Sequence, residues 1–211
     1  MSYAVKEIFF TRQGEGHHTG REAVFCRFSG CNLWNGLEQD RFSSKTMCGF
    51  CDTDFVGVDG TDGGYYTPAA LAEKIASFWP ANNPNRFVVC TGGEPLLQMD
   101  TDLVEALHAQ KFTIAIETNG TRRPPEGIDW ICVSPKAGTR LVLNHGNELK
   151  IVVPQVGLDP TQFEHLKFDH FFVQPMDGPS VKENTVIAEV FASERPLWKV
   201  SHQMHKIWGI R

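Results

Sequence analysis

Six short apolar segments recur along the chain, and polar residues follow most of them. Most are rich in β-branched or aromatic side chains, and their runs are nearly continuous rather than alternating. Continuous runs of this kind are typical of strands covered on both faces in a parallel sheet. We therefore predict about six mostly parallel strands, at residues 23–28, 86–90, 112–117, 130–134, 149–153 and 170–174.

Helical patterns lie between several of these segments. Residues 67–79 begin with Thr67 as a helix N-cap and Pro68 at the first helical position. Residues 101–110 and 181–193 also have helical character. Strands that alternate with helices predict an α/β fold with right-handed crossovers. With about six strands, the fold expected is an incomplete, TIM-like barrel in one domain.

Polar motifs stand where the predicted strands end. TGGEP (91–95) follows the second strand, ETN (117–119) the third, SPK (134–136) the fourth and QPMD (174–177) the sixth. The carboxyl ends of parallel strands meet at one edge of a sheet, where α/β folds bind their ligands. The sequence therefore predicts a single shared site at this edge.

Length and charge narrow the class of protein. The 211 residues carry a net charge of −5 and contain no dense run of Lys and Arg, which argues against duplex nucleic acid as a partner. No apolar stretch approaches the ~20 residues of a membrane span, and the first residues lack the pattern of a secretion signal. We expect a cytoplasmic protein whose six cysteines do not form a disulfide framework.

Three cysteines follow the first predicted strand. Sixteen residues separate Cys31 from Cys48, and two separate Cys48 from Cys51. A zinc site normally needs a fourth ligand, which His17 or His18 would supply. Three thiolates on a four-iron cluster instead leave one iron free to bind a ligand. Both readings stay open at this point, and the remaining cysteines are expected to be small buried hydrophobes: Cys26, Cys90 and Cys132.

The close cysteine pair, the third cysteine after the first strand, the CDT sequence and TGGEP resemble the radical S-adenosylmethionine enzymes. The first gap departs from that family, whose usual spacing is C-x3-C-x2-C. Loop closure costs only slowly more with length, so a long gap leaves the chemistry possible. The resemblance implies a [4Fe-4S] cluster, S-adenosylmethionine, and a partial barrel with fewer helices than the full core of that superfamily.

A narrower resemblance covers nearly the whole chain. The order of motifs is similar to that of the 7-carboxy-7-deazaguanine synthases: FTRQGEGHHTGREAVFCRFSGCNLW, CDTDF, TGGEPLLQ, ETNGT, VSPKAG, ELKIVVP and FFVQPMDGP. The resemblance implies a lyase of queuosine and 7-deazapurine biosynthesis that converts 6-carboxy-5,6,7,8-tetrahydropterin to 7-carboxy-7-deazaguanine with loss of ammonia. It further implies Mg²⁺, a homodimer, and a flavodoxin-like reductase as electron donor.

The same resemblance assigns cofactor residues. The cluster ligands would be Cys31, Cys48 and Cys51, and Thr53 would bind Mg²⁺. Glu94 would accept a hydrogen bond from the ammonium group of S-adenosylmethionine, and the glycines before it would let the backbone approach that ligand. The residues expected along S-adenosylmethionine are Phe50, Cys51, Asp52, Gly92, Gly93, Glu94, Glu117, Ser134, Pro135, Lys136, Gln174, Pro175, Met176 and Asp177.

A carboxylated pterin needs a cation for its carboxylate and acceptors for its N–H edge. Arg27 fits the first need as a bidentate donor, and Glu15 fits the second because a carboxylate accepts two N–H groups. The apolar residues of the C-terminal tail, such as Trp208, predict that the tail docks. By resemblance, the substrate residues are Arg12, Gln13, Gly14, Glu15, Arg27, Thr91, His205 and Arg211, the last through its terminal carboxylate.

Several alternatives stay open. No general base is evident; Glu15 and His202 are candidates only by their chemistry. A glycyl-radical activating enzyme would share the cofactors but bind a large protein, and a non-catalytic module would use the cysteines for zinc. The long loop 32–47 is either a surface loop or the place where a reductase docks.

Overall fold

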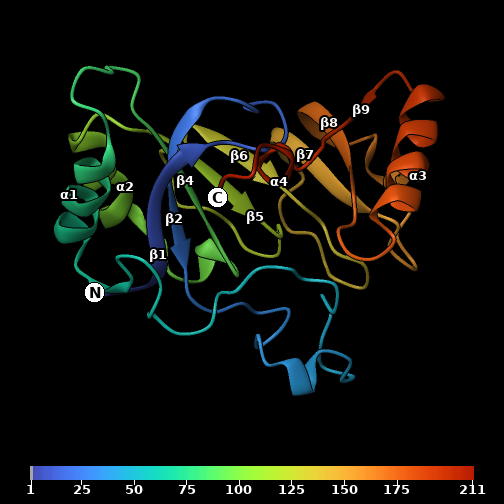
Figure 1. Ribbon diagram of the computed structural model, residues 1–211, viewed down its shortest axis with the longest axis horizontal. Helices are drawn as coiled ribbons and strands as arrows, with labels where there is room; N and C mark the ends of the chain where they lie inside the picture. The colour runs from blue at the N-terminus through green and yellow to red at the C-terminus, as the bar shows by residue number, and fades with distance from the viewer. Residues whose placement is uncertain (1) are drawn as a thin grey trace.

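The computed structural model describes residues 2–211, and one nine-stranded sheet runs through most of them (Figure 1). The strand order is β3-β1-β2-β4-β5-β6-β7-β8-β9. The strands are β1 (Tyr3–Arg12), β2 (Glu22–Phe28), β3 (Gly64–Tyr66), β4 (Phe87–Gly92), β5 (Thr113–Thr118), β6 (Trp130–Val133), β7 (His145–Val153), β8 (Lys167–Pro175) and β9 (Trp198–Val200).

The sheet is mostly parallel. All neighbours from β2 to β9 pair in parallel, whereas β1 pairs antiparallel with both β2 and β3. The α/β class and the six expected strands, now β2 and β4 to β8, are confirmed. The count of about six is too low for the whole sheet, because β1, β3 and β9 also join it.

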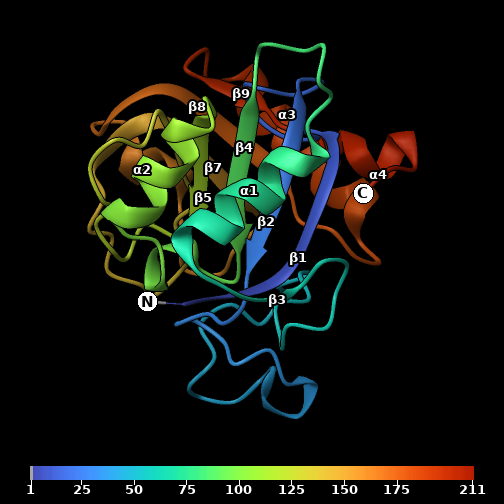
Figure 2. The ribbon, with the colours of Figure 1, turned by 90° about the vertical axis from the view of Figure 1, so that its left-hand side faces the viewer.

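Between residues 2 and 211, four α-helices accompany the sheet: α1 (Pro68–Phe78), α2 (Thr101–Ala109), α3 (Val181–Ser193) and α4 (Met204–Trp208). The first three match the expected segments, and the Thr67 hydroxyl caps α1 by accepting from the backbone N–H of Ala70. Three short 3₁₀ turns complete the elements: η1 (Glu38–Asp40), η2 (Pro95–Leu97) and η3 (Pro160–Phe163). In Figure 2, α1 and α2 lie in front of β4 and β5, and Figure 1 places α3 at the opposite end, beside β8. No helix between residues 2 and 211 is long and apolar enough to cross a membrane.

The two faces of the sheet differ in chemistry. On the outer face, side chains such as Cys90, Ile116 and Leu149 are fully buried in the core beneath the helices. Residues of opposite parity point to the inner face, where adjacent strands align Arg27 with Thr91. The expectation of apolar cover on both faces is therefore wrong for the inner face, whose polar side chains line a cavity.

The connection between β1 and β2 lies against the starts of the parallel strands. The ring of His17 stacks on that of His170 with centroids 4.1 Å apart, and the ring of His18 lies 4.2 Å from that of Trp130. This stack covers one end of the curved sheet. The residues just before it, from Gln13 to Glu15, line the cavity.

Candidate active site

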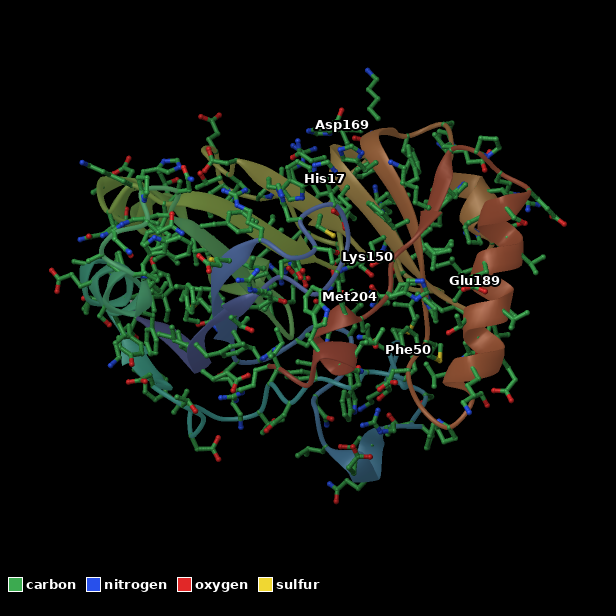
Figure 3. The ribbon with its side chains drawn as sticks, turned by 45° about the horizontal axis from the view of Figure 1, so that its top comes forward. His17, Phe50, Lys150, Asp169, Glu189 and Met204 are labelled. Atoms are coloured by element: carbon green, nitrogen blue, oxygen red, sulfur yellow. The ribbon has the colours of Figure 1, made fainter. Side chains whose placement is uncertain are left out.

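The inner face of the sheet encloses a cavity of about 700 Å³. Its walls come from the ends of the parallel strands, the cysteine segment, the β1–β2 connection and the C-terminal tail. All the expected site residues line it except Glu94 and Pro135. In Figure 3, Met204 at the start of α4 lies between Lys150 of β7 above it and Phe50 of the cysteine segment below and to the right. The prediction that the strand ends share one site agrees with this arrangement.

Three thiols gather at one end of the cavity. Cys31, Cys48 and Cys51 all line the cavity, and the backbone N–H of Leu33 donates to Cys31 Sγ at 3.4 Å. A Cβ on Gly93 would lie 2.2 Å from the carbonyl oxygen of Gly30 and 2.8 Å from Cys31 Cβ. Glycine is therefore needed for the loop after β4 to pack beside Cys31.

This donor set fits an iron–sulfur cluster. Three thiolates with N–H donors near sulfur are the usual surroundings of such clusters. A zinc site with His17 or His18 as the fourth ligand is not supported. His17 and His18 stack at the far end of the sheet, and Figure 3 shows His17 well away from Phe50. The other three cysteines, Cys26, Cys90 and Cys132, are buried as expected.

Glu94 turns away from the cavity, contrary to expectation. It is fully buried, and its carboxylate accepts from the backbone N–H of Leu96 at 3.0 Å, the Thr118 hydroxyl at 2.7 Å and the backbone N–H of Asn119 at 2.8 Å. Burial raises the pKa of this carboxyl, and the three donors oppose that rise. The Glu94 carboxylate therefore joins the loop after β4 to the loop after β5. The expected direct contact between Glu94 and the ammonium group of S-adenosylmethionine is not supported.

Replacing Glu94 by alanine should therefore destabilise the fold. Three buried donors lose their acceptor, so we expect the free energy of unfolding to fall by about 2–4 kcal/mol. Glu94→Gln keeps one acceptor oxygen and should lose less. Urea denaturation of both variants measures this; an unchanged midpoint for Glu94→Ala would contradict the bracing role.

The Glu15 carboxylate lines the cavity and is held on both of its oxygens. Lys150 Nζ donates to its Oε2, and Gln203 Nε2 donates to its Oε1 at 2.9 Å. Burial raises the pKa of this carboxyl, but the charge and hydrogen bond of Lys150, with help from Gln203 and His205, lower it to about 2. Glu15 is therefore ionised at neutral pH.

A second carboxylate, Glu117, stands at the end of β5. Its Oε1 accepts from Gln13 Nε2 at 2.9 Å and lies 3.8 Å from Lys150 Nζ. Thr91 Oγ1 approaches its other oxygen at 3.5 Å. The residues predicted from QGEG, from the end of β4 and from the end of β5 are thus brought together.

Arg27 presents part of its guanidinium to the cavity. Its Nε donates to Glu7 Oε1 at 2.9 Å, and the other oxygen of Glu7 pairs with the guanidinium of Arg211. With Nε occupied, the two terminal nitrogens of Arg27 are the ones left for an anion. End-on, bidentate contact with a carboxylate is therefore the available geometry.

The loop after β6 supplies a half-buried amine, Lys136. Lys136 Nζ donates to the backbone oxygen of Ser134 at 2.7 Å and to its hydroxyl at 2.6 Å. Burial lowers the pKa of Lys136, and the nearby Cys48 opposes that change. Pro135, which lies between Ser134 and Lys136, does not line the cavity, so its expected contact with the cofactor is not supported.

The tail closes the cavity through polar contacts. Lys206 Nζ pairs with Asp52 Oδ2 at 2.7 Å and with Asp177 Oδ2 at 2.6 Å, so α4 is tied to the cysteine segment and to the end of β8. The expected apolar anchors are not those that dock: Trp208 and Ile207 remain 41% and 70% exposed. The two aspartates expected along the cofactor line the cavity and also pair with the tail.

Gly14 allows this docking. A Cβ there would lie 2.3 Å from His205 Nδ1, and the Gly14 carbonyl accepts from the backbone N–H of Met204 at 2.9 Å. At the end of the chain, the backbone oxygen of Arg211 accepts from the Thr11 hydroxyl at 2.6 Å. His205 and Arg211 both line the cavity, as expected.

Comparison with known proteins decides the family. Residues 45–147 match the model of the radical SAM superfamily. The chain is 59% identical to a 7-carboxy-7-deazaguanine synthase of Bradyrhizobium diazoefficiens and 57% identical to one of Burkholderia multivorans, each over the full length of both chains. The chain belongs to the 7-carboxy-7-deazaguanine synthase family. The crystal structure of QueE from Escherichia coli matches 97% of this chain and 95% of its own, with a TM-score of 0.71 and 27% identity.

Family membership confirms the radical SAM and 7-carboxy-7-deazaguanine synthase resemblances. The radical SAM region begins before Cys48 and ends within β7, so Cys31 and the β1–β2 connection lie outside it. The cavity residues that were not foreseen from the sequence include Glu7, Lys150, Gln203 and Lys206. Only Lys150 had a visible signal, because a lysine inside an apolar strand is rarely buried without a partner.

Proposed function

We propose that this protein is a radical S-adenosylmethionine lyase that converts 6-carboxy-5,6,7,8-tetrahydropterin to 7-carboxy-7-deazaguanine, a step of queuosine and other 7-deazapurine biosynthesis. The reaction contracts a ring and releases one nitrogen as ammonia, so it involves no net oxidation. The observation that carries the proposal is one cavity with three thiols at one end and Arg27, Glu15 and Glu117 around the rest.

A [4Fe-4S] cluster together with S-adenosylmethionine supplies the one-electron chemistry that starts the reaction. Cys31, Cys48 and Cys51 would hold the cluster, since their thiols share one end of the cavity. The cavity also offers the backbone of Gly92 and Gly93 beside them. The remaining contacts proposed for S-adenosylmethionine come from Phe50, Asp52, Glu117, Ser134, Lys136, Gln174, Pro175, Met176 and Asp177.

The substrate contacts follow from charge and geometry. The free terminal nitrogens of Arg27 would bind the pterin carboxylate, and the ionised Glu15 would accept from the N–H edge of the pyrimidine ring. His205 and the end of the chain at Arg211 would close over the ring. Arg12, Gln13, Gly14 and Thr91 complete the proposed set. Fixing the substrate in this way restricts its motion during rearrangement, which is where positioning accelerates a reaction.

Three finer features are part of the proposal. Thr53 would provide one oxygen ligand to Mg²⁺, with substrate oxygens and water completing the shell. A second copy of the chain would form a homodimer, and the protein would act in the cytoplasm. A flavodoxin-like reductase would deliver electrons near the loop 32–47, where Phe42 is 91% exposed.

The role of that loop has its own test. Exchanging residues 32–47 for a three-residue gap should slow reduction by flavodoxin more than reduction by dithionite. Equal changes with both reductants would remove the docking role.

Turnover tests the function itself. The protein is reconstituted anaerobically with iron and sulfide and incubated with S-adenosylmethionine, dithionite, Mg²⁺ and the tetrahydropterin. Mass spectrometry should find 7-carboxy-7-deazaguanine, lighter than the substrate by one ammonia. Formation of 5′-deoxyadenosine and methionine without that product would contradict the proposed substrate and favour another radical reaction.

The docked tail predicts sensitivity to C-terminal extension. A peptide fused after Arg211 should displace the end of the chain from the cavity and lower kcat/KM by about tenfold or more. The same peptide fused to the N-terminus serves as the control. Equal kcat/KM values for the two fusions would show that the end of the chain does not contribute.

A further inference from the structure

Lys150 is a buried lysine at the centre of the cavity wall. It lies in β7, is only 4% exposed, and stands between the fully buried Leu149 and Ile151. Its Nζ donates to Glu15 Oε2 and lies 3.8 Å from Glu117 Oε1. One cation thus joins carboxylates from the β1–β2 connection and from β5, and Figure 3 shows Lys150 near Met204 of the tail.

The two carboxylates are also fixed from their other sides. Gln203, which immediately precedes α4, donates to Glu15 Oε1, and Gln13 donates to Glu117 Oε1, both at 2.9 Å. Each carboxylate is therefore held at two points and keeps lone pairs for a ligand. The arrangement connects β7, β5, the β1–β2 connection and the tail around one ammonium group.

We propose that Lys150 is a positioning residue that keeps Glu15 ionised and aimed at the N–H edge of the substrate. This inference rests on the proposed function and deepens it. The ligand chemistry it serves is a ring edge that presents two adjacent N–H donors, as a pterin does. Such an edge needs a carboxylate that accepts on both oxygens, because a protonated carboxyl has one donor in place of an acceptor.

The charges around Lys150 support this role. Burial lowers the pKa of Lys150, yet Glu117 and Glu15 outweigh burial and raise that pKa well above its usual value. Without Lys150, the burial that raises the pKa of Glu15 would lose its main opponent. The other titratable and charged groups that face the Lys150–Glu15 pair from neighbouring elements are Glu117, Cys132, Lys136, Glu148 and His205.

Substrate binding without turnover provides the first test. The reconstituted protein with S-adenosylmethionine, but no reductant, is titrated calorimetrically with 6-carboxytetrahydropterin between pH 5 and pH 8. Wild-type affinity should not fall through loss of the Glu15 charge in this range. In Lys150→Met, affinity should fall by about tenfold for each pH unit below the raised pKa of Glu15. Lys150→Arg should restore the wild-type profile.

The controls separate this inference from the proposed function. Lys74 pairs with Asp62 at the surface beside α1, so Lys74→Met should leave the profile unchanged. A Lys150→Met profile that parallels the wild type would overturn the positioning role. If the wild-type protein does not bind the pterin at any pH, the proposed function fails, and the inference is then decided by stability.

Unfolding of the ligand-free protein gives that second measurement. In Lys150→Met, the folded-state pKa of Glu15 lies above its unfolded value, so stability is lost as pH rises between the two. In the double variant Lys150→Met, Glu15→Gln this loss should disappear. If single and double variants show the same pH dependence of Tm, Lys150 does not hold the charge of Glu15.

Discussion

Cys31→Ala is expected to remove the cluster and to reduce turnover to below about one thousandth of the wild-type rate. Cys31 is the thiol that stands apart in sequence from the close pair, yet it lines the same end of the cavity. The other three cysteines, Cys26, Cys90 and Cys132, are buried elsewhere in the sheet. Iron and sulfide content after reconstitution, together with the visible spectrum, measures the loss.

Cys26→Ala is the matched control, because Cys26 is a fully buried cysteine on the outer face of β2. It should keep the cluster and the brown colour while losing about 1 kcal/mol of stability from the deleted sulfur. A Cys31→Ala protein with a full cluster and normal turnover would refute the assignment of the three ligands.

Arg27→Met should have the second largest effect. The Arg27 side chain is 19% exposed and is oriented by Glu7. Its two terminal guanidinium nitrogens therefore form a preorganised anion-binding site. Losing a partly buried, charge-assisted contact costs about 2–4 kcal/mol. We therefore expect kcat/KM for the carboxylated pterin to fall by about 30- to 1000-fold, with little change in S-adenosylmethionine affinity.

Arg27→Lys keeps the charge but not the planar fork, and its loss should be intermediate. Arg86→Met is the control, since Arg86 contacts the backbone oxygen of Gln110 outside the cavity. Steady-state kinetics decides between the outcomes. Unchanged kcat/KM in Arg27→Met would remove the proposed carboxylate site.

Much of the fold follows from local sequence. β4, β5, β7 and β8 contain apolar residues whose outer-face side chains form the core. The starts of α1 and α2 are marked by Thr67 and Asp100 as side-chain caps. β1 does not read as a buried strand because Lys6 and Glu7 interrupt it. In the structure those two side chains form ion pairs with groups far along the chain, which no local pattern reveals.

The site was predictable where backbone geometry alone places it. Parallel strands end at one edge, so Thr91, Glu117, Ser134 and Gln174 share the cavity regardless of side-chain detail. Orientation was not predictable: Glu94 follows two glycines at this edge, but its carboxylate turns to the backbone of the next loop. The way the tail docks was not predictable either, because it depends on the ion pairs of Lys206 rather than on the apolar residues of the tail.

The most direct test of the proposed function is a crystal structure of the reconstituted protein, grown without oxygen with S-adenosylmethionine and 6-carboxytetrahydropterin. We expect a four-iron cluster on Cys31, Cys48 and Cys51. We expect the pterin between them and Lys150, with its carboxylate on Arg27 and its N–H edge on Glu15. A pterin bound outside this cavity, or inside it with its carboxylate away from Arg27, would refute the proposed substrate site.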